Sequence, residues 1–313
     1  MKDLCLAALA CVAAFAVWGC GKEQSSTGAP DKAAASSPRK AVEEKVPAYT
    51  YPAPVKGHIK ELNIGEFDVV DGIAYQAIDG SGTVAYVASK PIASPMLADA
   101  ACPLSQAQAL SKLRNASFAE VTLDTAGRSR YFAAGTPFGG GLTDLTPRDW
   151  SSTLKADAGR AAGSVVHRQY GRFEFDLPVT NPKFDQISYG DRQRSRRVPA
   201  TTPKPTEQAI TATYVALRDA ALKKDLKATL AALGFDAKQS TAIRGMDGID
   251  ADFLVFADRF LTPGTPGDPW NKPGSGQVRG EGVKASGKKF FNDYYFDLCG
   301  DHLVLTGIVE QSP

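Results

Sequence analysis

The sequence lacks the residue patterns that identify the common kinds of enzyme. It contains no G-x-S-x-G nucleophile elbow, no H-E-x-x-H motif and no P-loop. The three histidines, His58, His167 and His302, are far apart, and the cysteines show no metal-ligand spacing. We therefore expect no metal and no cofactor, and we assign each histidine an ordinary surface or core role.

The chain also lacks an excess of charge of either sign. Its 36 Lys and Arg residues nearly balance its 34 Asp and Glu residues, which leaves a formal net charge of +2. A dedicated nucleic-acid-binding protein has a strongly basic face, so we expect no nucleic-acid partner. With 43% apolar and 22% charged residues, the composition is that of an ordinary globular protein.

The first apolar run is too short for a stable transmembrane helix. It extends from Leu4 to Val17, follows Lys2 and precedes a small residue and a cysteine, whereas a membrane-spanning helix needs about 20 apolar residues. This arrangement is typical of a cleaved export signal.

The four residues Val17-Trp18-Gly19-Cys20 resemble the lipobox of bacterial lipoproteins. The resemblance implies a signal peptide over residues 1–19, an acylated Cys20 as the mature N-terminus, and membrane attachment through this lipid anchor. Gly21 in place of Asp implies the outer membrane, with the protein facing the periplasm. Two alternatives stay open, which are an ordinary signal peptide cut near Gly19 and an uncleaved short anchor.

The cysteines divide by position. Cys5 and Cys11 leave with the signal and Cys20 carries lipid, so Cys102 and Cys299 remain in an oxidising compartment. An even remainder of two predicts one disulfide. A pair of buried free thiols is the alternative.

Composition divides the rest of the chain into a tether and two domains. Residues 20–54 are rich in Ser, Ala, Lys, Glu and Pro, which predicts a disordered tether spanning about 30 Å. A domain of unassigned family follows over residues 55–199, and a second over residues 205–313. Between them, Arg192–Arg197 and several prolines indicate a linker, although the arginines can also contact phosphate or carboxylate groups.

Alternating apolar residues and turn signals predict a mainly antiparallel α+β fold for the first domain. Ser105 and Gln108 form a capping-box pattern that predicts a helix over Gln106–Asn115. The expected strands lie in two hairpins and one further segment, namely Ile73–Ile78 with Thr83–Val87, Val121–Leu123 with Tyr131–Phe132, and Arg172–Leu177.

The second domain is predicted to begin with helices and to end with strands. Thr206 and Asp225 can cap the first two helices, Gly234 can end the second, and Asp250 precedes the third. The helical stripes contain Ile210, Tyr214 and Leu217, then Leu226, Leu230 and Leu233, then Phe253, Phe256 and Phe260, and the strands are Val278–Ala285, Lys289–Cys299 and Leu303–Val309.

This order of elements is similar to the nuclear transport factor two-like, or SnoaL-like, cone fold. The residues that carry the similarity are Tyr294–Leu298 and the final strand Leu303–Ile308. The resemblance implies a pocket between a curved antiparallel sheet and the helices.

Strand alternation places Asn292, Tyr294 and Phe296 on the face toward that pocket, and Phe253 and Phe256 can oppose them. These residues line either a small-ligand cavity or a well-filled core. The opposite face carries Cys299, which supports its pairing with Cys102.

The Pro- and Gly-rich stretch 262–282 contains Trp270, which either contacts a partner or packs back onto the domain.

The function that these observations favour is a non-catalytic, periplasm-facing lipoprotein. It would bind an envelope protein, an envelope polymer or a small apolar ligand through its C-terminal domain. The alternative is a hydrolase or isomerase that uses the cone cavity with an Asp or His general base. A structural envelope component with a filled core is the third possibility.

Overall fold

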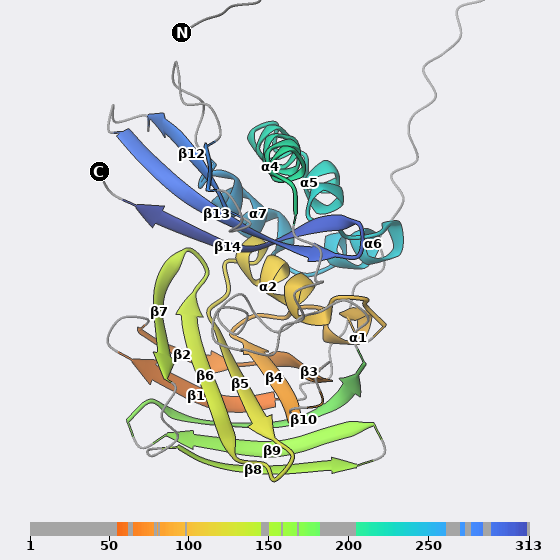
Figure 1. Ribbon diagram of the computed structural model, residues 1–313, viewed down its shortest axis with the longest axis vertical. Helices are drawn as coiled ribbons and strands as arrows, with labels where there is room; N and C mark the ends of the chain where they lie inside the picture. The colour runs from red at the N-terminus through yellow and green to blue at the C-terminus, as the bar shows by residue number, and fades with distance from the viewer. Residues whose placement is uncertain are drawn as a thin grey trace, which may run out of the picture. The chain divides into compact units, whose positions relative to one another are not determined.

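In the described part of the first half of the chain, the computed structural model contains ten strands and two helices (Figure 1). The strands are β1 (Val55–Glu61), β2 (Gly65–Val69), β3 (Asp71–Gln76), β4 (Gly82–Ala88), β5 (Phe118–Asp124), β6 (Ser129–Thr136), β7 (Gly139–Asp144), β8 (Trp150–Asp157), β9 (Arg160–His167) and β10 (Gly171–Thr180). The helices are α1 (Ser94–Leu97) and α2 (Pro103–Leu113).

The structure describes residues 55–61, 65–77, 80, 82–97, 99–144, 150–157, 159–167, 169–181, 205–260, 270–272, 277–283 and 289–311. The predicted signal peptide, tether and linker lie outside these residues. Among the described helices, none is long and apolar enough to cross a membrane.

The strands form two sheets that share β10. Sheet A has the order β2-β1-β10-β9-β8 and is antiparallel, and sheet B continues from the end of β10 through β3, β4, β5 and β6 to β7. At this junction, Val179 and Thr180 pair in parallel with Ala74 and Tyr75 of β3, so the sheet is mixed. The two predicted hairpins are confirmed as β3–β4 and β5–β6.

Sheets A and B enclose one apolar core between their facing sides. It contains Val87 and Val121 of sheet B and Val165, Phe173 and Phe175 of sheet A. Because side chains alternate along each strand, the other face of sheet B presents a second apolar surface toward the helices.

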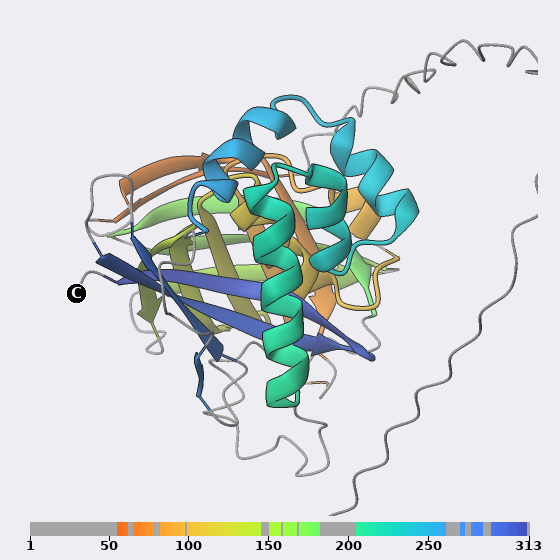
Figure 2. The same ribbon diagram turned by 90° about the horizontal axis from the view of Figure 1, so that it is seen from above.

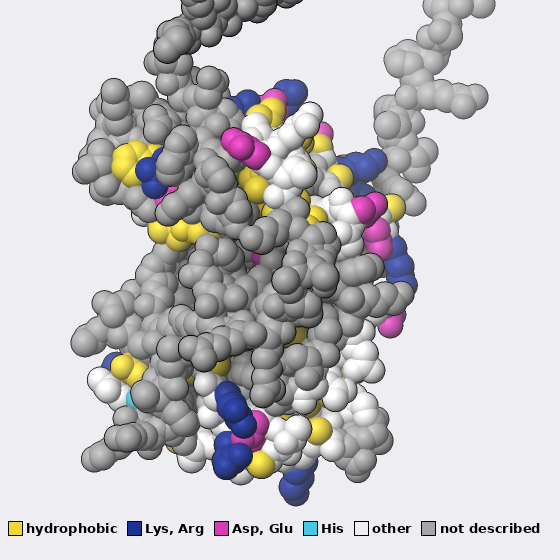
Figure 3. Space-filling model, viewed as in Figure 1, with side chains coloured by type: hydrophobic (Ala, Val, Ile, Leu, Met, Phe, Trp, Pro, Cys, Tyr) yellow, Lys and Arg dark blue, Asp and Glu magenta, His cyan; other side chains and the backbone are white. Residues whose placement is uncertain are grey.

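The turn between β5 and β6 is held by a carboxylate. Asp124 accepts hydrogen bonds from the backbone N–H groups of Ala126 and Arg128, both at 2.9 Å, and forms ion pairs with Arg128 and Arg130. The backbone N–H of Arg128 is the main cause that lowers the pKa of Asp124 to about 2. Charges of both signs lie together at this lower end of the molecule (Figure 3).

The second half confirms the predicted order of helices followed by a three-strand antiparallel meander, and with it the α+β class. The helices are α4 (Glu207–Leu222), α5 (Leu226–Ala232), α6 (Ala237–Arg244) and α7 (Ile249–Ala257). The strands of this sheet C are β11 (Trp270–Lys272), β12 (Gln277–Val283), β13 (Lys289–Cys299) and β14 (His302–Gln311), where the short β11 adds to the meander. Figure 2 shows the helices lying over one side of sheet C.

Most predicted helix boundaries are confirmed in this half. Thr206 and Asp225 cap α4 and α5 through their side-chain oxygens, and Gly234 follows α5 with a positive φ of 82°. The third predicted start is wrong, because α7 begins at Ile249 and Asp250 lies within its first turn, where a negative charge stabilises the helix dipole. Helix α6 was not predicted, although its capping box, Asp236 with Gln239, is readable in the sequence.

The predicted start of α2 is also wrong. The helix begins at Pro103 after Cys102, so Ser105 lies inside the helix and forms no capping box with Gln108. Proline is favoured at the first helical position, since its missing N–H would have no partner there.

Helix α2 is almost completely enclosed. Ten of its eleven residues are buried. Its Leu104 and Leu110 belong to the same apolar cluster as Tyr86 of β4 and Leu305 of β14. One continuous core therefore contains residues from both predicted domains, with α2 between sheet B and sheet C (Figure 1).

The polar side chains of α2 have specific partners. The hydroxyl of Tyr86 donates to Ser111 Oγ at 3.0 Å, and Gln239 Nε2 donates to Gln106 Oε1 at 3.1 Å. The Lys112 ammonium lies 4.9 Å from the centre of the Phe118 ring, and burial lowers the pKa of Lys112 to about 8. These interactions offset part of the cost of burying polar groups.

The end of α2 is fastened to the beginning of α7. Arg114 lies 3.3 Å from Asp252 and donates to the carbonyl oxygen of Asp247 at 2.7 Å. Lys90 also contacts Asp252, at 2.6 Å.

The beginning of α2 is fastened covalently. Cys102 and Cys299 form a disulfide, as predicted, and both residues are at most 1% exposed. The bridge joins the N-cap of α2 to the last residue of β13 across 197 positions of sequence.

We expect the double substitution Cys102→Ala/Cys299→Ala to lower the free energy of unfolding by up to about 5 kcal/mol, because the bridge restricts a very long loop in the unfolded chain. Urea unfolding measured by circular dichroism would give this difference. With thiols blocked, the native protein should migrate faster on a gel without reductant than with it. Equal mobility would contradict the pairing.

Candidate functional site

The structure places most of the predicted cavity residues together in the second half of the chain. Asn292, Tyr294 and Phe296 share one face of β13 and are 2%, 0% and 3% exposed. Phe253 and Phe256 of α7 are buried in the same apolar cluster as Tyr294 and Phe296.

Trp270 is located by its backbone only. It begins β11 and pairs with Arg279 of β12. Its side chain lies outside the described part of the chain, so its role in binding stays a prediction.

Packed aromatic rings occupy the space next to Tyr294. Its ring centre lies 5.1 Å from that of Phe260 and 4.8 Å from that of Tyr214, and Phe256 meets Phe260 edge-on at 5.1 Å. Such distances are those of well-packed aromatic pairs. The described residues therefore favour a filled core over an open ligand cavity at this position.

A short chain of hydrogen bonds runs through these rings. Asn292 Nδ2 donates to the carbonyl oxygen of Arg259 at 2.6 Å and to the hydroxyl of Tyr294 at 3.2 Å. The hydroxyl of Tyr294 donates to the same carbonyl at 3.4 Å. The carbonyl of Arg259 was not predicted as a partner, because no sequence pattern reports which backbone group a distant side chain reaches.

The tyrosines of this cluster are poor proton acceptors. Burial raises the pKa of both Tyr214 and Tyr294, so both phenols remain protonated at physiological pH. A general base must lie within hydrogen-bonding reach of its substrate and titrate near the working pH. Asn292 and Tyr294 bond, among the described residues, only to hydroxyl and carbonyl groups, an arrangement that suits a structural role.

The three histidines lie on separate strands. His58 on β1 pairs with Asp68 at 2.9 Å, and His302 begins β14 beside Asp301. His167 is buried, and its Nδ1 accepts the backbone N–H groups of Gln169 and Tyr170. Within the described ranges, no three His, Cys, Asp or Glu residues are grouped as a metal site.

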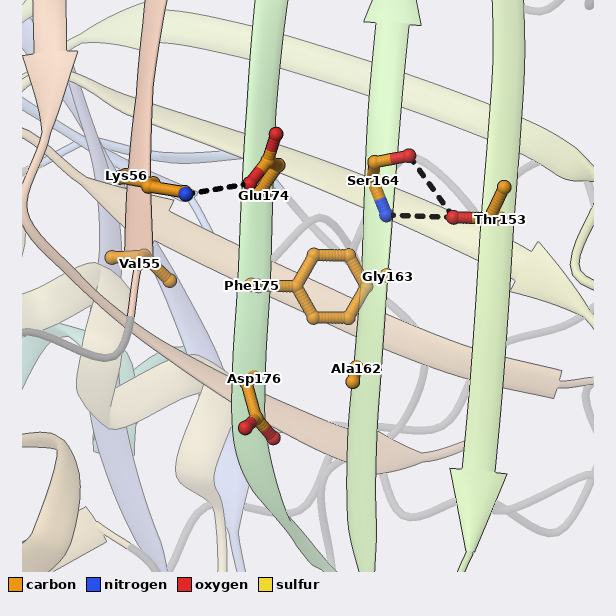
Figure 4. A pocket seen from close by; sticks show the side chains of 9 residues that line it. All are labelled: Val55, Lys56, Thr153, Ala162, Gly163, Ser164, Glu174, Phe175 and Asp176. Carbon is orange, nitrogen blue, oxygen red and sulfur yellow. Dashed lines mark hydrogen bonds and ion pairs between the residues drawn. The ribbon is translucent and has the colours of Figure 1, made fainter.

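An open pocket of about 520 Å³ lies on the outward face of sheet A (Figure 4). Its volume is within the usual range of small-ligand sites. It is lined by residues of β1, β8, β9 and β10, namely Val55, Lys56, Thr153, Ala162, Gly163, Ser164, Glu174, Phe175 and Asp176.

Polar groups face each other across this pocket. Lys56 forms an ion pair with Glu174 at 3.0 Å on one side, and Thr153 and Ser164 are joined through their hydroxyls at 3.0 Å on the other. The hydrogen bond from Lys56 is the main cause that lowers the pKa of Glu174. The carboxylate thus stays ionised at neutral pH and can accept hydrogen bonds from a ligand.

The floor of the pocket depends on small residues. A Cβ atom on Gly163 would overlap the carbonyl oxygen of Thr153 and would lie 2.9 Å from Cζ of Phe175, whose ring extends toward that position (Figure 4). The alternation of Phe173 and Phe175 with polar residues predicted the strand that is β10. It did not predict the pocket, because the other lining residues come from the neighbouring strands β1, β8 and β9.

We expect Gly280→Ala to destabilise the aromatic cluster by about 1–3 kcal/mol. A Cβ atom at Gly280 would overlap the hydroxyl oxygen of Tyr214, so the ring would have to move. Urea unfolding of the variant measures the loss.

The double variant Tyr214→Phe/Gly280→Ala serves as the control, since it removes the nearest atom in the clash. It should recover part of the stability relative to Gly280→Ala. If the two substitutions were simply additive, the packing described here would be incorrect.

Comparisons of this chain with models of known protein families, with curated proteins and with solved structures found no match. The resemblances to the lipobox and to the cone fold therefore stay predictions.

Proposed function

We propose that this chain is a lipid-anchored protein of the bacterial cell envelope whose folded unit is a non-catalytic binding module. Cys20 is the proposed attachment site, and the lipobox-like residues before it support this assignment.

The observation that carries the proposal is the buried disulfide between Cys102 and Cys299. Disulfides persist in oxidising compartments and are rare in the cytosol of most organisms. The sequence resemblance to an export signal and the structural disulfide are independent, and both support an oxidising compartment outside the cytosol.

The aromatic cluster argues against a catalytic site in the predicted cavity. A hydrolase or isomerase in the predicted cavity would need a carboxylate or histidine there, whereas the described neighbours of Asn292 and Tyr294 are phenols and a backbone carbonyl. Packed rings from Tyr214 and Phe260 take up the adjoining space.

The pocket on sheet A is the proposed binding face. Its hydroxyls and carboxylates, from Thr153, Ser164, Glu174 and Asp176, suit a ligand that is rich in hydroxyl donors. The ligand class that fits this chemistry and this compartment is a polysaccharide strand of the envelope.

We expect mass spectrometry of the mature protein to show an N-terminal Cys20 carrying acyl chains. Cys20→Ala should stay unprocessed, because the acylated cysteine defines the cleavage site of a lipoprotein signal. A mature wild-type chain with a bare Cys20 would overturn the anchor.

We expect Ala162→Trp to weaken binding of envelope polysaccharide fragments at least tenfold in calorimetric titration, because the indole would fill the pocket at its floor.

Binding by the wild type should be constant from pH 8 to pH 5, since the pKa of Glu174 lies below its usual value. Protonation should weaken binding only at lower pH.

Ser151→Trp is the matched control. Ser151 is exposed on the same strand as Thr153 and on the same face, outside the residues that line the pocket. Equal binding by both tryptophan variants would exclude the pocket as the binding face, and no binding by the wild type would exclude this ligand class.

A further inference from the structure

The turn between α4 and α5 exposes a group of lysines. We call the three lysines Lys223, Lys224 and Lys227, together with the adjacent Leu222, the lysine turn. All four side chains are exposed, and Leu222 is 36% exposed. The turn joins two helices that lie over the same side of sheet C (Figure 2).

The positive charges of the lysine turn are not neutralised by neighbours. Within the described residues, Lys223, Lys224 and Lys227 form no ion pair, whereas Lys56 and Lys90 each contact a carboxylate.

The nearest acidic residues in sequence have other contacts. Asp225 accepts the backbone N–H of Ala228 at 2.9 Å as the cap of α5, and Asp219 is bound by Arg218 at 2.8 Å. Three lysines and the Asp225 carboxylate leave the turn with a net charge of +2.

Lys224 occupies a backbone conformation that normally suits glycine. Its φ is +56°, which is in the left-handed region and costs a non-glycine residue about 1–2 kcal/mol. Backbone hydrogen bonds hold it there, from Lys224 N–H to the Ala221 carbonyl at 2.9 Å and from Asp225 N–H to the Ala220 carbonyl at 3.0 Å. These bonds close the turn that ends α4 and leave the Lys224 side chain exposed.

We propose that the lysine turn binds the anionic phospholipid surface of the membrane to which the chain is anchored. Lysine ammonium groups are mobile point charges, which suit a diffuse layer of phosphates, whereas arginine suits paired recognition of a single one. The exposed Leu222 adds an apolar contact beside them. This inference rests on the proposed anchor at Cys20, because an anchored chain would keep its folded unit near the bilayer.

The test uses the full lipidated protein, reconstituted into vesicles of phosphatidylcholine alone or of phosphatidylcholine with phosphatidylglycerol. An amine-reactive reagent modifies exposed lysines, and mass spectrometry measures the modification at each position. We expect labelling of Lys223, Lys224 and Lys227 to fall at least threefold on the anionic vesicles and to recover at high salt, because salt screens surface charges. Labelling of Lys155, which is exposed on β8, should be the same on both.

Lys224→Gly separates charge from stability. Removing one lysine should lower the affinity for the anionic surface about fivefold, which weakens the protection of Lys223 and Lys227. Glycine also relieves the backbone strain, so the urea midpoint should be unchanged or higher. Lys155→Gln is the matched control, since it removes one exposed positive charge elsewhere and should leave the protection intact.

Two results would be decisive against parts of this account. Equal labelling on both kinds of vesicle by a protein shown to be lipidated would overturn the lysine turn and leave the anchor standing. If mass spectrometry instead showed no lipid on Cys20, the anchor would be overturned, and the lysine turn that rests on it would be overturned as well.

Discussion

The burial of α2 between sheet B and sheet C is the constraint on which the rest of this structure depends. Ten of its eleven residues are buried, and both of its ends are fastened to the second half of the chain. The disulfide from Cys102 holds the first end, and Arg114 with Asp252 holds the last. An enclosed helix cannot move without exposing apolar surface on both sides, so the two halves behave as parts of one core.

This arrangement moves the search for function from the interior to the surface. The aromatic cluster around Tyr294 belongs to the same core, and burial raises the pKa of its phenols, so they stay protonated. The proposed pocket lies on strands packed over the core between sheets A and B, and the lysine turn joins helices packed in the core around α2. A rigid body with polar contact surfaces is what a tethered binding module requires.

The charges of the chain illustrate why net charge alone says little about partners. A formal value of +2 for the whole sequence hides a local arrangement. Within the part of the chain that the structure describes, several bases contact acids, whereas Lys223, Lys224 and Lys227 form no ion pair. Membrane surfaces respond to local charge within about a Debye length, so the arrangement matters more than the sum.

Local signals in the sequence determined much of the secondary structure. Side-chain caps at Thr206 and Asp225, the stop at Gly234 and alternation in the strands act over a few residues, so they are readable without the fold. The disulfide was also predictable, because only two cysteines remained after the predicted signal and the proposed lipid site. The start of α2 failed because Ser105 and Gln108 match a capping pattern as well as Pro103 matches a first helical turn.

Only the tertiary structure decided which buried surfaces meet. The sharing of β10 between two sheets, the enclosure of α2 and the closure of the rings around Tyr294 all join residues far apart in sequence. The pocket on sheet A likewise needs four strands from distant segments. Periodicity reports that a face is apolar but not which face it will contact, because that choice depends on the packing of the whole chain.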